Sequence, residues 1–131
     1  MSAEAAGPGI TRLGQIAINV YDVERATAFY RDVLGLRFLF AAGQLAFFDC
    51  GGVRLMLDHA EKPEFDHPSS ILYFSVPDIR AAHQRLLDAG VTIVGEPQII
   101  ARMPDHDLWM SFFRDTEENV MALMSEARRD A

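Results

Sequence analysis

The sequence is poor in cysteine and in basic residues, and it has no long hydrophobic run. A single cysteine, Cys50, excludes an internal disulfide and favours a reducing, cytoplasmic location. A net charge of −7 argues against nucleic acid or an anionic membrane surface as the partner. Because no apolar run approaches the roughly 20 residues of a membrane-spanning helix, we expect no membrane partner either.

Several functional motifs are also missing. The chain has no glycine-rich phosphate loop, no zinc-type Cys/His spacing and no Gly-x-Ser-x-Gly elbow. Residues 1–10 lack the basic start and apolar stretch of a secretory signal, so we expect a disordered N-terminal lead-in. Half of the 131 residues are hydrophobic, which is enough for the core of one domain, expected over residues 11–126.

What the sequence does contain is an internal repeat. Residues 18–26 are echoed by residues 74–82, with an offset of 56. The pair Phe47-Phe48 recurs as Phe112-Phe113 with an offset of 65, and residues 53–57 align with residues 120–124 with an offset of 67. These offsets predict a second hairpin two residues longer than the first. Two copies of one half-domain usually enclose a cleft that suits a ligand.

Each copy predicts a βαβββ module, over about 11–60 and 70–126, and therefore an α+β fold. Asp22 and Asp78 are suited to cap the helices, and Gly35 and Gly90 to end them. Alternation and turn residues predict strands at 13–20, 38–40, 46–49, 53–58, 71–76, 91–94, 108–113 and 120–124. Residues 61–70 and 96–107 are expected to be loops, and residues after Ser125 to be frayed.

The repeat resembles the vicinal oxygen chelate superfamily, also called the glyoxalase/bleomycin-resistance/dioxygenase family. The resemblance rests on residues 15–26, on Phe29-Tyr30-Arg31-Asp32-Val33-Leu34-Gly35-Leu36, and on Phe113-Arg114-Asp115-Thr116-Glu117-Glu118-Asn119-Val120. The last stretch lacks the proline and glycine of the family's motif. The resemblance implies two tandem modules that form a curved mixed sheet around a cup, with the helices on the outer face.

In the metal-dependent branches of this family, four strand positions supply the ligands of a divalent cation. The resemblance assigns those positions to Gln15, Leu55, Ile71 and Ala122. Only Gln15 has a donor atom, and a hard or borderline cation needs several oxygen or nitrogen ligands. We therefore expect no metal and no other cofactor, as in the antibiotic-binding branch.

Strand alternation predicts which side chains line the cup. The set that includes Gln15 would face the cup, and the alternate set would pack beneath the helices. The predicted lining is Gln15, Ala17, Asn19, Val53, Leu55, Leu57, Ile71, Tyr73, Ser75, Val120, Ala122 and Met124. From this lining, with Trp109 added as an aromatic that either stacks on a ligand or fills the core, the predicted ligand-binding residues are Gln15, Asn19, Leu55, Leu57, Ile71, Tyr73, Trp109 and Ala122.

Three residues are candidates for catalysis: His106, Asp107 and Tyr73. His106 lies between two aspartates, and a histidine beside a carboxylate suits a general base. Because neighbouring residues of a strand point to opposite faces, the two aspartates are not expected to contact it alike. The alternative is a solvated loop before a strand. Residues 114–118 are interpreted as a solvated hairpin.

Three functions follow from these observations. The first is a cytoplasmic, homodimeric, metal-independent protein that binds an amphipathic or aromatic small molecule, for example to sequester a toxic compound. The alternative is a lyase, isomerase or dioxygenase-type enzyme of the same superfamily, with a nonstandard metal or acid–base site. The third is a regulatory module whose sheets bind a partner. The expected partners are a small organic ligand and a second copy of the chain.

Overall fold

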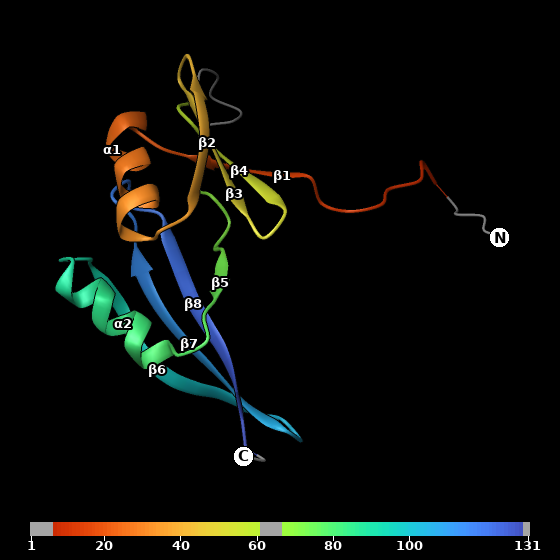
Figure 1. Ribbon diagram of the computed structural model, residues 1–131, viewed down its shortest axis with the longest axis vertical. Coiled ribbons are helices and arrows are strands. Elements are labelled where there is room, and N and C mark those ends of the chain that lie inside the picture. Colours follow the sequence, from red (N-terminus) through yellow and green to blue (C-terminus); the bar gives the residue numbers. More distant parts are fainter. Residues whose placement is uncertain (1–6, 61–66, 130–131) are drawn as a thin grey trace.

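The computed structural model describes residues 7–60 and 67–129, which form two successive βαβββ units (Figure 1). The first unit contains β1 (Gln15–Asn19), α1 (Val23–Ala28), the π-helical turn η1 (Phe29–Val33), β2 (Arg37–Ala42), β3 (Leu45–Cys50) and β4 (Val53–Asp58). The second contains β5 (Tyr73–Ser75), α2 (Ile79–Asp88), β6 (Ile93–Arg102), β7 (His106–Arg114) and β8 (Val120–Arg128). The predicted α+β class and the two modules are confirmed. Of the predicted lead-in and connection, residues 1–6 and 61–66 lie outside the described residues.

The predicted helix boundaries are also confirmed. Asp22 accepts a hydrogen bond from the backbone N–H of Arg25 at 3.0 Å, and Asp78 accepts one from Ala81 at 3.2 Å. Gly35 follows the first helical segment with a φ of 74°, a left-handed conformation that glycine adopts without strain. Neither helix of the described residues is long and apolar enough to cross a membrane.

The strands form two separate four-stranded mixed sheets rather than one continuous sheet. The strand orders are β1-β4-β3-β2 and β5-β8-β7-β6, so the two sheets have the same topology. In each, the first and last strands of the module pair in parallel and the other neighbours are antiparallel. Figure 1 shows the sheets one after the other along the molecule, with both helices on the same side of them.

The pairing corrects the predicted register of β4. Ala17 aligns with Met56, and its repeat equivalent Tyr73 aligns with Ala122. Met56 therefore corresponds to Ala122, which is an offset of 122 − 56 = 66 rather than 67. The offset of 65 for the aromatic pair stands, because Phe47 pairs with Met56 as Phe112 pairs with Ala122. The second hairpin is thus one residue longer than the first, not two.

The end of the chain is more regular than predicted. The loop expected at 96–107 is mostly strand, because β6 extends to Arg102 and β7 begins at His106. Pro97 is compatible with this because β6 is an edge strand with register shifts. The fraying expected after Ser125 is wrong as well, since β8 reaches Arg128. The guanidinium of Arg129 holds the β6–β7 turn by donating to carbonyl oxygens of residues 103, 104 and 106 and to Asp107.

The core lies between the helices and the sheets. In the first module Ile18, Leu55, Leu57 and Phe48 contact the layer that contains Ala26, Phe29 and Tyr30, and in the second module Phe113, Met121 and Leu123 pack with Ile79 and Leu86. Among residues 7–60 and 67–129, no helix lies over the opposite face of either sheet (Figure 1). That asymmetry leaves two open sheet faces, and these position the candidate site.

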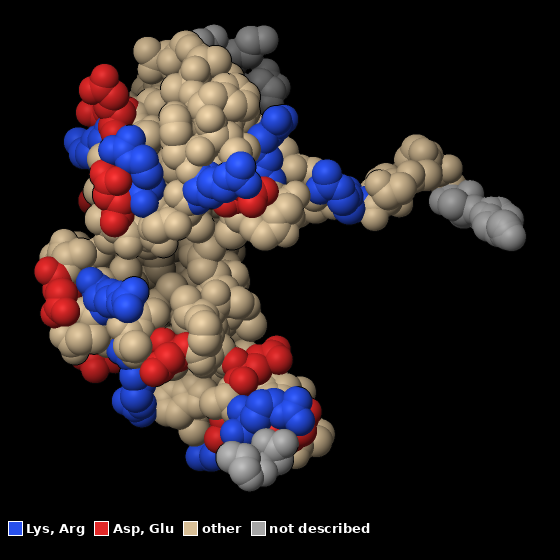
Figure 2. All heavy atoms as spheres, in the orientation of Figure 1, with Lys and Arg blue, Asp and Glu red and all other residues tan. Residues whose placement is uncertain are grey.

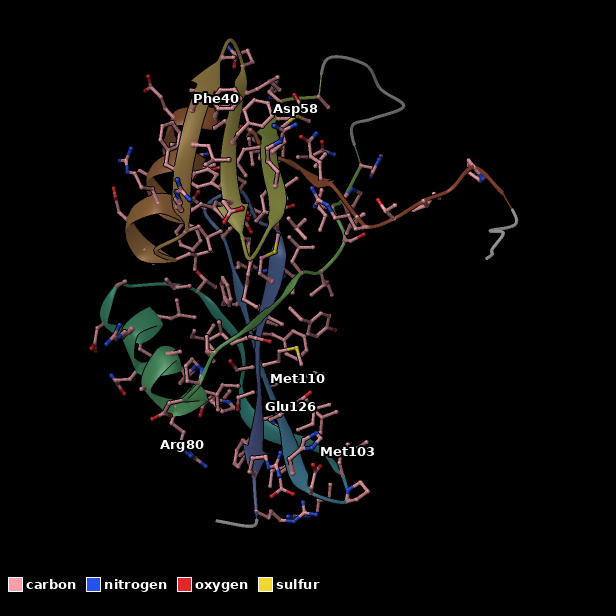
Figure 3. All side chains as sticks on the ribbon, turned by 45° about the vertical axis from the view of Figure 1, so that its right-hand side comes forward. Phe40, Asp58, Arg80, Met103, Met110 and Glu126 are labelled. Carbon is pink, nitrogen blue, oxygen red and sulfur yellow. The ribbon has the colours of Figure 1, made fainter. Side chains whose placement is uncertain are left out.

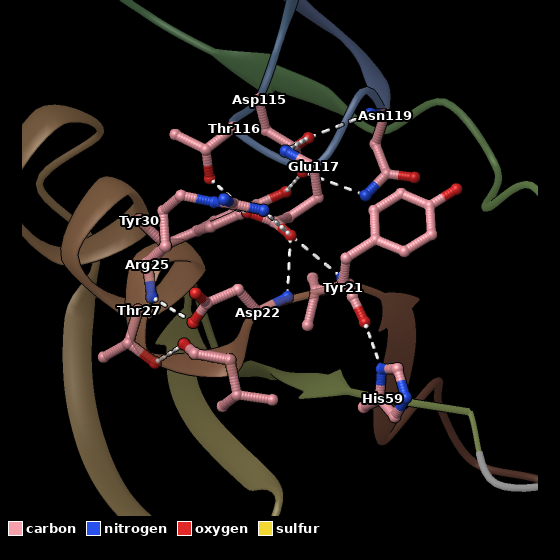
Figure 4. A network of polar contacts seen from close by, with 12 residues as sticks. Tyr21, Asp22, Arg25, Thr27, Tyr30, His59, Asp115, Thr116, Glu117 and Asn119 are labelled. Atoms are coloured by element: carbon pink, nitrogen blue, oxygen red, sulfur yellow. Dashed lines mark hydrogen bonds and ion pairs between the residues drawn. The ribbon is translucent and has the colours of Figure 1, made fainter.

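The turn between β7 and β8 joins the two modules, and it is not the solvated hairpin that the sequence suggested. The side chain of Glu117 is fully buried against the start of α1 (Figure 4). It forms a two-point ion pair with Arg25 and accepts hydrogen bonds from the backbone N–H groups of Tyr21 and Asp22, both at 2.9 Å. Burial alone raises the pKa of this carboxyl, but the hydrogen bonds from Arg25, Asp22, Thr116 and Tyr21 outweigh burial and lower the pKa to about 2.

Asp115 completes the junction from the same turn. It accepts a 2.7 Å hydrogen bond from the hydroxyl of Tyr30, which is fully buried in η1. It also accepts from the backbone N–H groups of Glu117 and Asn119, and Asn119 donates in turn to the carbonyl of Asn19. Burial and the negative charge of Asp115 raise the pKa of Tyr30. The turn therefore connects the second module to the first through buried polar contacts.

Candidate functional site

The candidate site consists of the two open sheet faces, because they hold exposed aromatic and apolar side chains that no helix or strand of the described residues covers. Large exposed side chains on these faces include Phe40 in β2 and Tyr73 in β5, each 46% exposed. Figure 3 shows Met110 and Glu126 on the side of the second sheet away from α2, whereas Arg80 extends from the helix. Exposed apolar surface of this kind is typical of a binding site.

The open face of the first sheet carries a row of stacked side chains. Phe40 and Phe47 stack with a centroid separation of 4.5 Å and an interplanar angle of 26°. The guanidinium of Arg54 lies 5.2 Å from the centroid of Phe47 and donates from Nε to the amide oxygen of Gln15 at 2.8 Å. The amide nitrogen of Gln15 points to the sulfur of Met56 at 3.6 Å. Sequence analysis did not identify this row, because the offset of 67 assigned Arg54 and Met56 of β4 to the helix side of the sheet.

The three predicted lining residues of β4, Val53, Leu55 and Leu57, alternate onto the wrong face for a ligand on this surface. Leu55 is 2% exposed and Leu57 is fully buried, and both belong to the core beneath α1. They pair with Ile16 and Ile18, which also face the helix. The orientation predicted for them is wrong by one residue, and Arg54 and Met56 take their place on the open face.

The open face of the second sheet agrees with the predicted orientation. Tyr73 and Phe112 meet edge to face at 6.0 Å, on either side of Ala122, which pairs with both residues. Ala122 is fully buried yet lies outside the main core cluster. Ile71, just before β5, is 43% exposed. Strand alternation places Met110 and Met124, which pair with each other, on this same face.

His106 begins β7 on the same open face as Phe112, six residues before it. Its Nδ1 lies 2.7 Å from Asp105 and its Nε2 4.0 Å from Glu126. The hydrogen bond from His106 lowers the pKa of Asp105. Asp107 points away and binds Arg129 instead. The expectation that the two aspartates differ in their contact with His106 is confirmed.

The last two predicted residues, Trp109 and Asn19, are engaged in contacts within the chain. Trp109 packs partly against the core under α2, with the guanidinium of Arg80 4.9 Å from its ring centroid. Asn19 ends β1 and is used in the chain's own contacts, since its amide donates to the carbonyl of His67 at 2.6 Å. Asn19 also borders a polar pocket of about 340 Å³ at the junction, together with Tyr21, His59, His67 and Asn119. No pattern in the sequence indicates this pocket, because its walls come from both modules.

The residues present do not fit a divalent metal. Within the described ranges 7–60 and 67–129, no three His, Cys, Asp or Glu side chains are grouped to hold one. With the corrected register, the four strand positions discussed above are Gln15, Met56, Ile71 and Ala122. One amide and one thioether are a poor ligand set, and the amide oxygen already accepts from Arg54. In one chain, moreover, Gln15 lies on one sheet and Tyr73 and Ala122 on the other.

Comparison with known proteins agrees with the fold. A family model described as Glyoxalase/Bleomycin resistance protein/Dioxygenase superfamily matches residues 12–123. No curated protein matches the sequence. Among solved structures, TnmS3, an antibiotic binding protein from Streptomyces sp. CB03234, has a TM-score of 0.74 at 22% identity, covering 92% of this chain and 99% of its own.

Two further solved structures show the same fold. A lactoylglutathione lyase from Agrobacterium tumefaciens has a TM-score of 0.68 at 22% identity, covering 90% of this chain and 96% of its own. The protein UcmS2 has a TM-score of 0.67 at 27% identity, covering 88% of this chain and 98% of its own. The structural neighbours therefore include both a binding protein and an enzyme.

Proposed function

The chain belongs to the Glyoxalase/Bleomycin resistance protein/Dioxygenase superfamily, and we propose that it is a metal-independent protein that binds a small aromatic or amphipathic molecule in the cytoplasm. The observation that carries the proposal is the composition of the open faces. They present aromatic rings, thioethers and a few fixed polar groups, a combination typical of organic ligand sites. In this proposal residues 11–126 act as one binding domain, and a concrete role is sequestration of a toxic compound.

Three observations support the proposal. The four strand positions offer an amide, a thioether and two hydrocarbon side chains, and Gln15 is engaged by Arg54. Tyr73 and Phe112 lie edge to face and provide a surface on which a flat ligand stacks. The structural neighbour TnmS3 is described as an antibiotic binding protein, which is consistent with a bulky organic ligand here.

We further propose that the chain is a homodimer and that a second copy completes the cup. The open faces of one chain belong to different sheets, so neither is closed by the other in the way a ligand cavity requires. Exposed apolar faces and unpaired edges such as β2 and β6 are normally covered. A copy that lays its second sheet over the first sheet of its partner would bring Gln15 and Tyr73 into one cavity.

The binding proposal is tested with a panel of aromatic and polycyclic compounds, by thermal shift and calorimetry on protein purified without chelator. We expect at least one compound to bind with less than stoichiometric Zn, Ni, Mn, Fe or Co present. Tyr73→Ala is expected to weaken that binding at least tenfold, because it removes the exposed ring beside Phe112. Tyr21→Ala is the matched control, since Tyr21 is 69% exposed outside both open faces.

One equivalent of tightly bound metal that is lost in Gln15→Ala would contradict metal independence. Equal losses in the two tyrosine variants would contradict the assignment of the open face. Binding of no compound by the wild-type protein would contradict the proposal as a whole.

An enzyme of the same superfamily is the second candidate, and the contact between His106 and Asp105 favours it. A carboxylate that holds one imidazole nitrogen leaves the other positioned to exchange a proton with a ligand on the open face. This candidate predicts lyase or isomerase turnover that His106→Asn abolishes while ligand binding remains. A binding protein would show no turnover in either form.

A further inference from the structure

Arg54 is the charged group on the open faces whose contacts point most directly to a ligand. Its Nε is fixed by the amide oxygen of Gln15 at 2.8 Å, and its plane lies over the ring of Phe47 at 5.2 Å. Within residues 7–60 and 67–129, no carboxylate pairs with its two terminal amino groups. The guanidinium is exposed and held in one orientation, so its outer edge is preorganised for a partner from outside the chain.

The outer edge of the Arg54 guanidinium faces a recess of about 570 Å³ at the end of the first sheet. The recess is lined by Arg12, Gly14, Gln15, Leu39, Asp49, Gly52 and Arg54. Its volume lies within the usual range for small-molecule sites. Arg12 adds positive charge but is used by the chain itself, because it donates to the carbonyls of Gly52 and Leu13. Asp49 lines the recess without forming an ion pair to either arginine.

An apolar surface continues from the recess across the sheet. Leu39 is 37% exposed and Phe40 is 46% exposed, and Phe40 stacks on Phe47 beside Arg54. A ligand whose charged end is bound by Arg54 therefore has an aromatic and aliphatic surface within reach of its ring. In a protein whose net charge is −7, a fixed guanidinium that has no carboxylate partner among the described residues is a local site for an anion.

We infer that the open face of the first sheet selects planar aromatic acids, with the ligand's carboxylate bound by both terminal amino groups of Arg54. The fork of a guanidinium matches a carboxylate in two parallel hydrogen bonds, which a lysine does not reproduce. The ring of the ligand lies over Leu39 and Phe40. Gln15 is a positioning residue, because it orients Arg54. The inference rests on the proposed function and names the ligand class of that site.

The test uses two probes of equal shape, 2-naphthoic acid and naphthalene-2-carboxamide, with calorimetry on the full-length protein at neutral pH. The carboxylate is ionised under these conditions and the amide is neutral. We expect the wild-type protein to bind the acid at least about tenfold more tightly than the amide, because charge-assisted hydrogen bonds are about twice as strong as neutral ones. The preference should fall as salt is added.

Three variants locate the preference. Arg54→Gln is expected to bind the two probes equally, and Arg54→Lys to keep only part of the difference. Arg80→Gln is the matched control, since Arg80 also lies over an aromatic ring, that of Trp109, but on the helix side of the second module. It should retain the full preference. Thermal melting of each variant checks that the fold is unchanged.

The outcomes separate this inference from the proposed function. If the wild-type protein binds both probes equally, or if Arg54→Gln keeps the preference for the acid, the inference is wrong while the binding function stands. If the wild-type protein binds neither probe, the inference is wrong, and the compound panel above decides independently whether the binding function is lost with it.

Discussion

At the scale of single residues, Glu117 connects the two modules through contacts with the start of α1. Its carboxylate is buried, and it accepts from Arg25 and from two backbone N–H groups at the start of α1. Those N–H groups have no partner within the helix, so the carboxylate satisfies them and interacts favourably with the helix dipole. The sequence did not indicate that Glu117 joins the modules, because a run of acidic residues in a turn is usually solvated.

Glu117→Gln is expected to lower the free energy of unfolding at neutral pH by about 2–3 kcal/mol, because hydrogen bonds to a buried charge are replaced by weaker ones. The folded-state pKa of about 2 lies below the ordinary value of 4.5. The stabilisation is therefore complete above pH 4.5 and is lost as the pH falls toward 2. Urea unfolding across this range should show the gap between wild type and variant closing. Glu118→Gln, an exposed neighbour, is the control, and a gap independent of pH would contradict the assignment.

Glu118 shows a different effect, because it adopts a φ of 70°. A left-handed conformation costs an L-residue about 1–2 kcal/mol, whereas glycine adopts it freely. Glycine also increases the entropy of the unfolded chain, which offsets about 0.4–1 kcal/mol. We expect Glu118→Gly to stabilise the protein by up to about 1 kcal/mol in chemical denaturation. Glu118→Ala keeps the strain and serves as the control; a larger loss for glycine than for alanine would show that the strain is absent.

At the scale of elements, one strand decides the composition of the site. The apolar run of β4 is compatible with either face, since Val53, Leu55 and Leu57 alternate with Arg54 and Met56. A one-residue shift exchanges the two sets completely. The pairing with β1 and β3 places the leucines in the core and leaves the arginine and methionine on the open face.

This register predicts opposite consequences for two adjacent truncations. Leu55→Ala should cost about 2–5 kcal/mol of stability, because Leu55 is 2% exposed in a packed core. Met56→Ala should cost less than about 1 kcal/mol, since Met56 lies on the face without a helix, and its effect should appear in ligand binding. Equilibrium urea unfolding measures both. A larger loss of stability for Met56→Ala than for Leu55→Ala would contradict this register and support the one expected from the sequence.

At the scale of the whole molecule, one chain presents two similar faces and completes neither. The space-filling view in Figure 2 shows the molecule hollowed between its upper and lower halves. The junction around Glu117 and Asp115 fixes how the modules follow each other, with the helices on the same side (Figures 1 and 4). We therefore expect a second copy, rather than the same chain, to complete the site.

We expect a homodimer of about 29 kDa, twice the chain's 14.6 kDa, to persist at micromolar concentration. Multi-angle light scattering measures this mass directly. Ile71→Glu places a charge on the open face of the second sheet and should shift the protein toward the monomer. Ile10→Glu is the control, because Ile10 is 85% exposed outside the folded modules. A monomeric mass for the wild-type protein at high micromolar concentration would contradict both the dimer and the shared cavity.

The sequence by itself determined the features that depend on neighbouring residues. The two modules, the helix caps at Asp22 and Asp78 and the order of strands follow from short-range patterns, and the offset of 56 between the two halves brought Tyr73 to the correct face. Local hydrogen bonds and periodicity encode these features directly.

Only the tertiary structure decided the features that depend on pairing. Whether Leu55 or Met56 faces the open side depends on one residue of turn length. The sequence of an apolar strand does not reveal this choice, because either face satisfies its hydrophobic pattern. The burial of Glu117 depends on the start of α1, which is more than ninety residues away along the chain. The separation of the strands into two sheets likewise follows from which edges pair, and it determines that the faces bearing Gln15 and Tyr73 belong to different sheets.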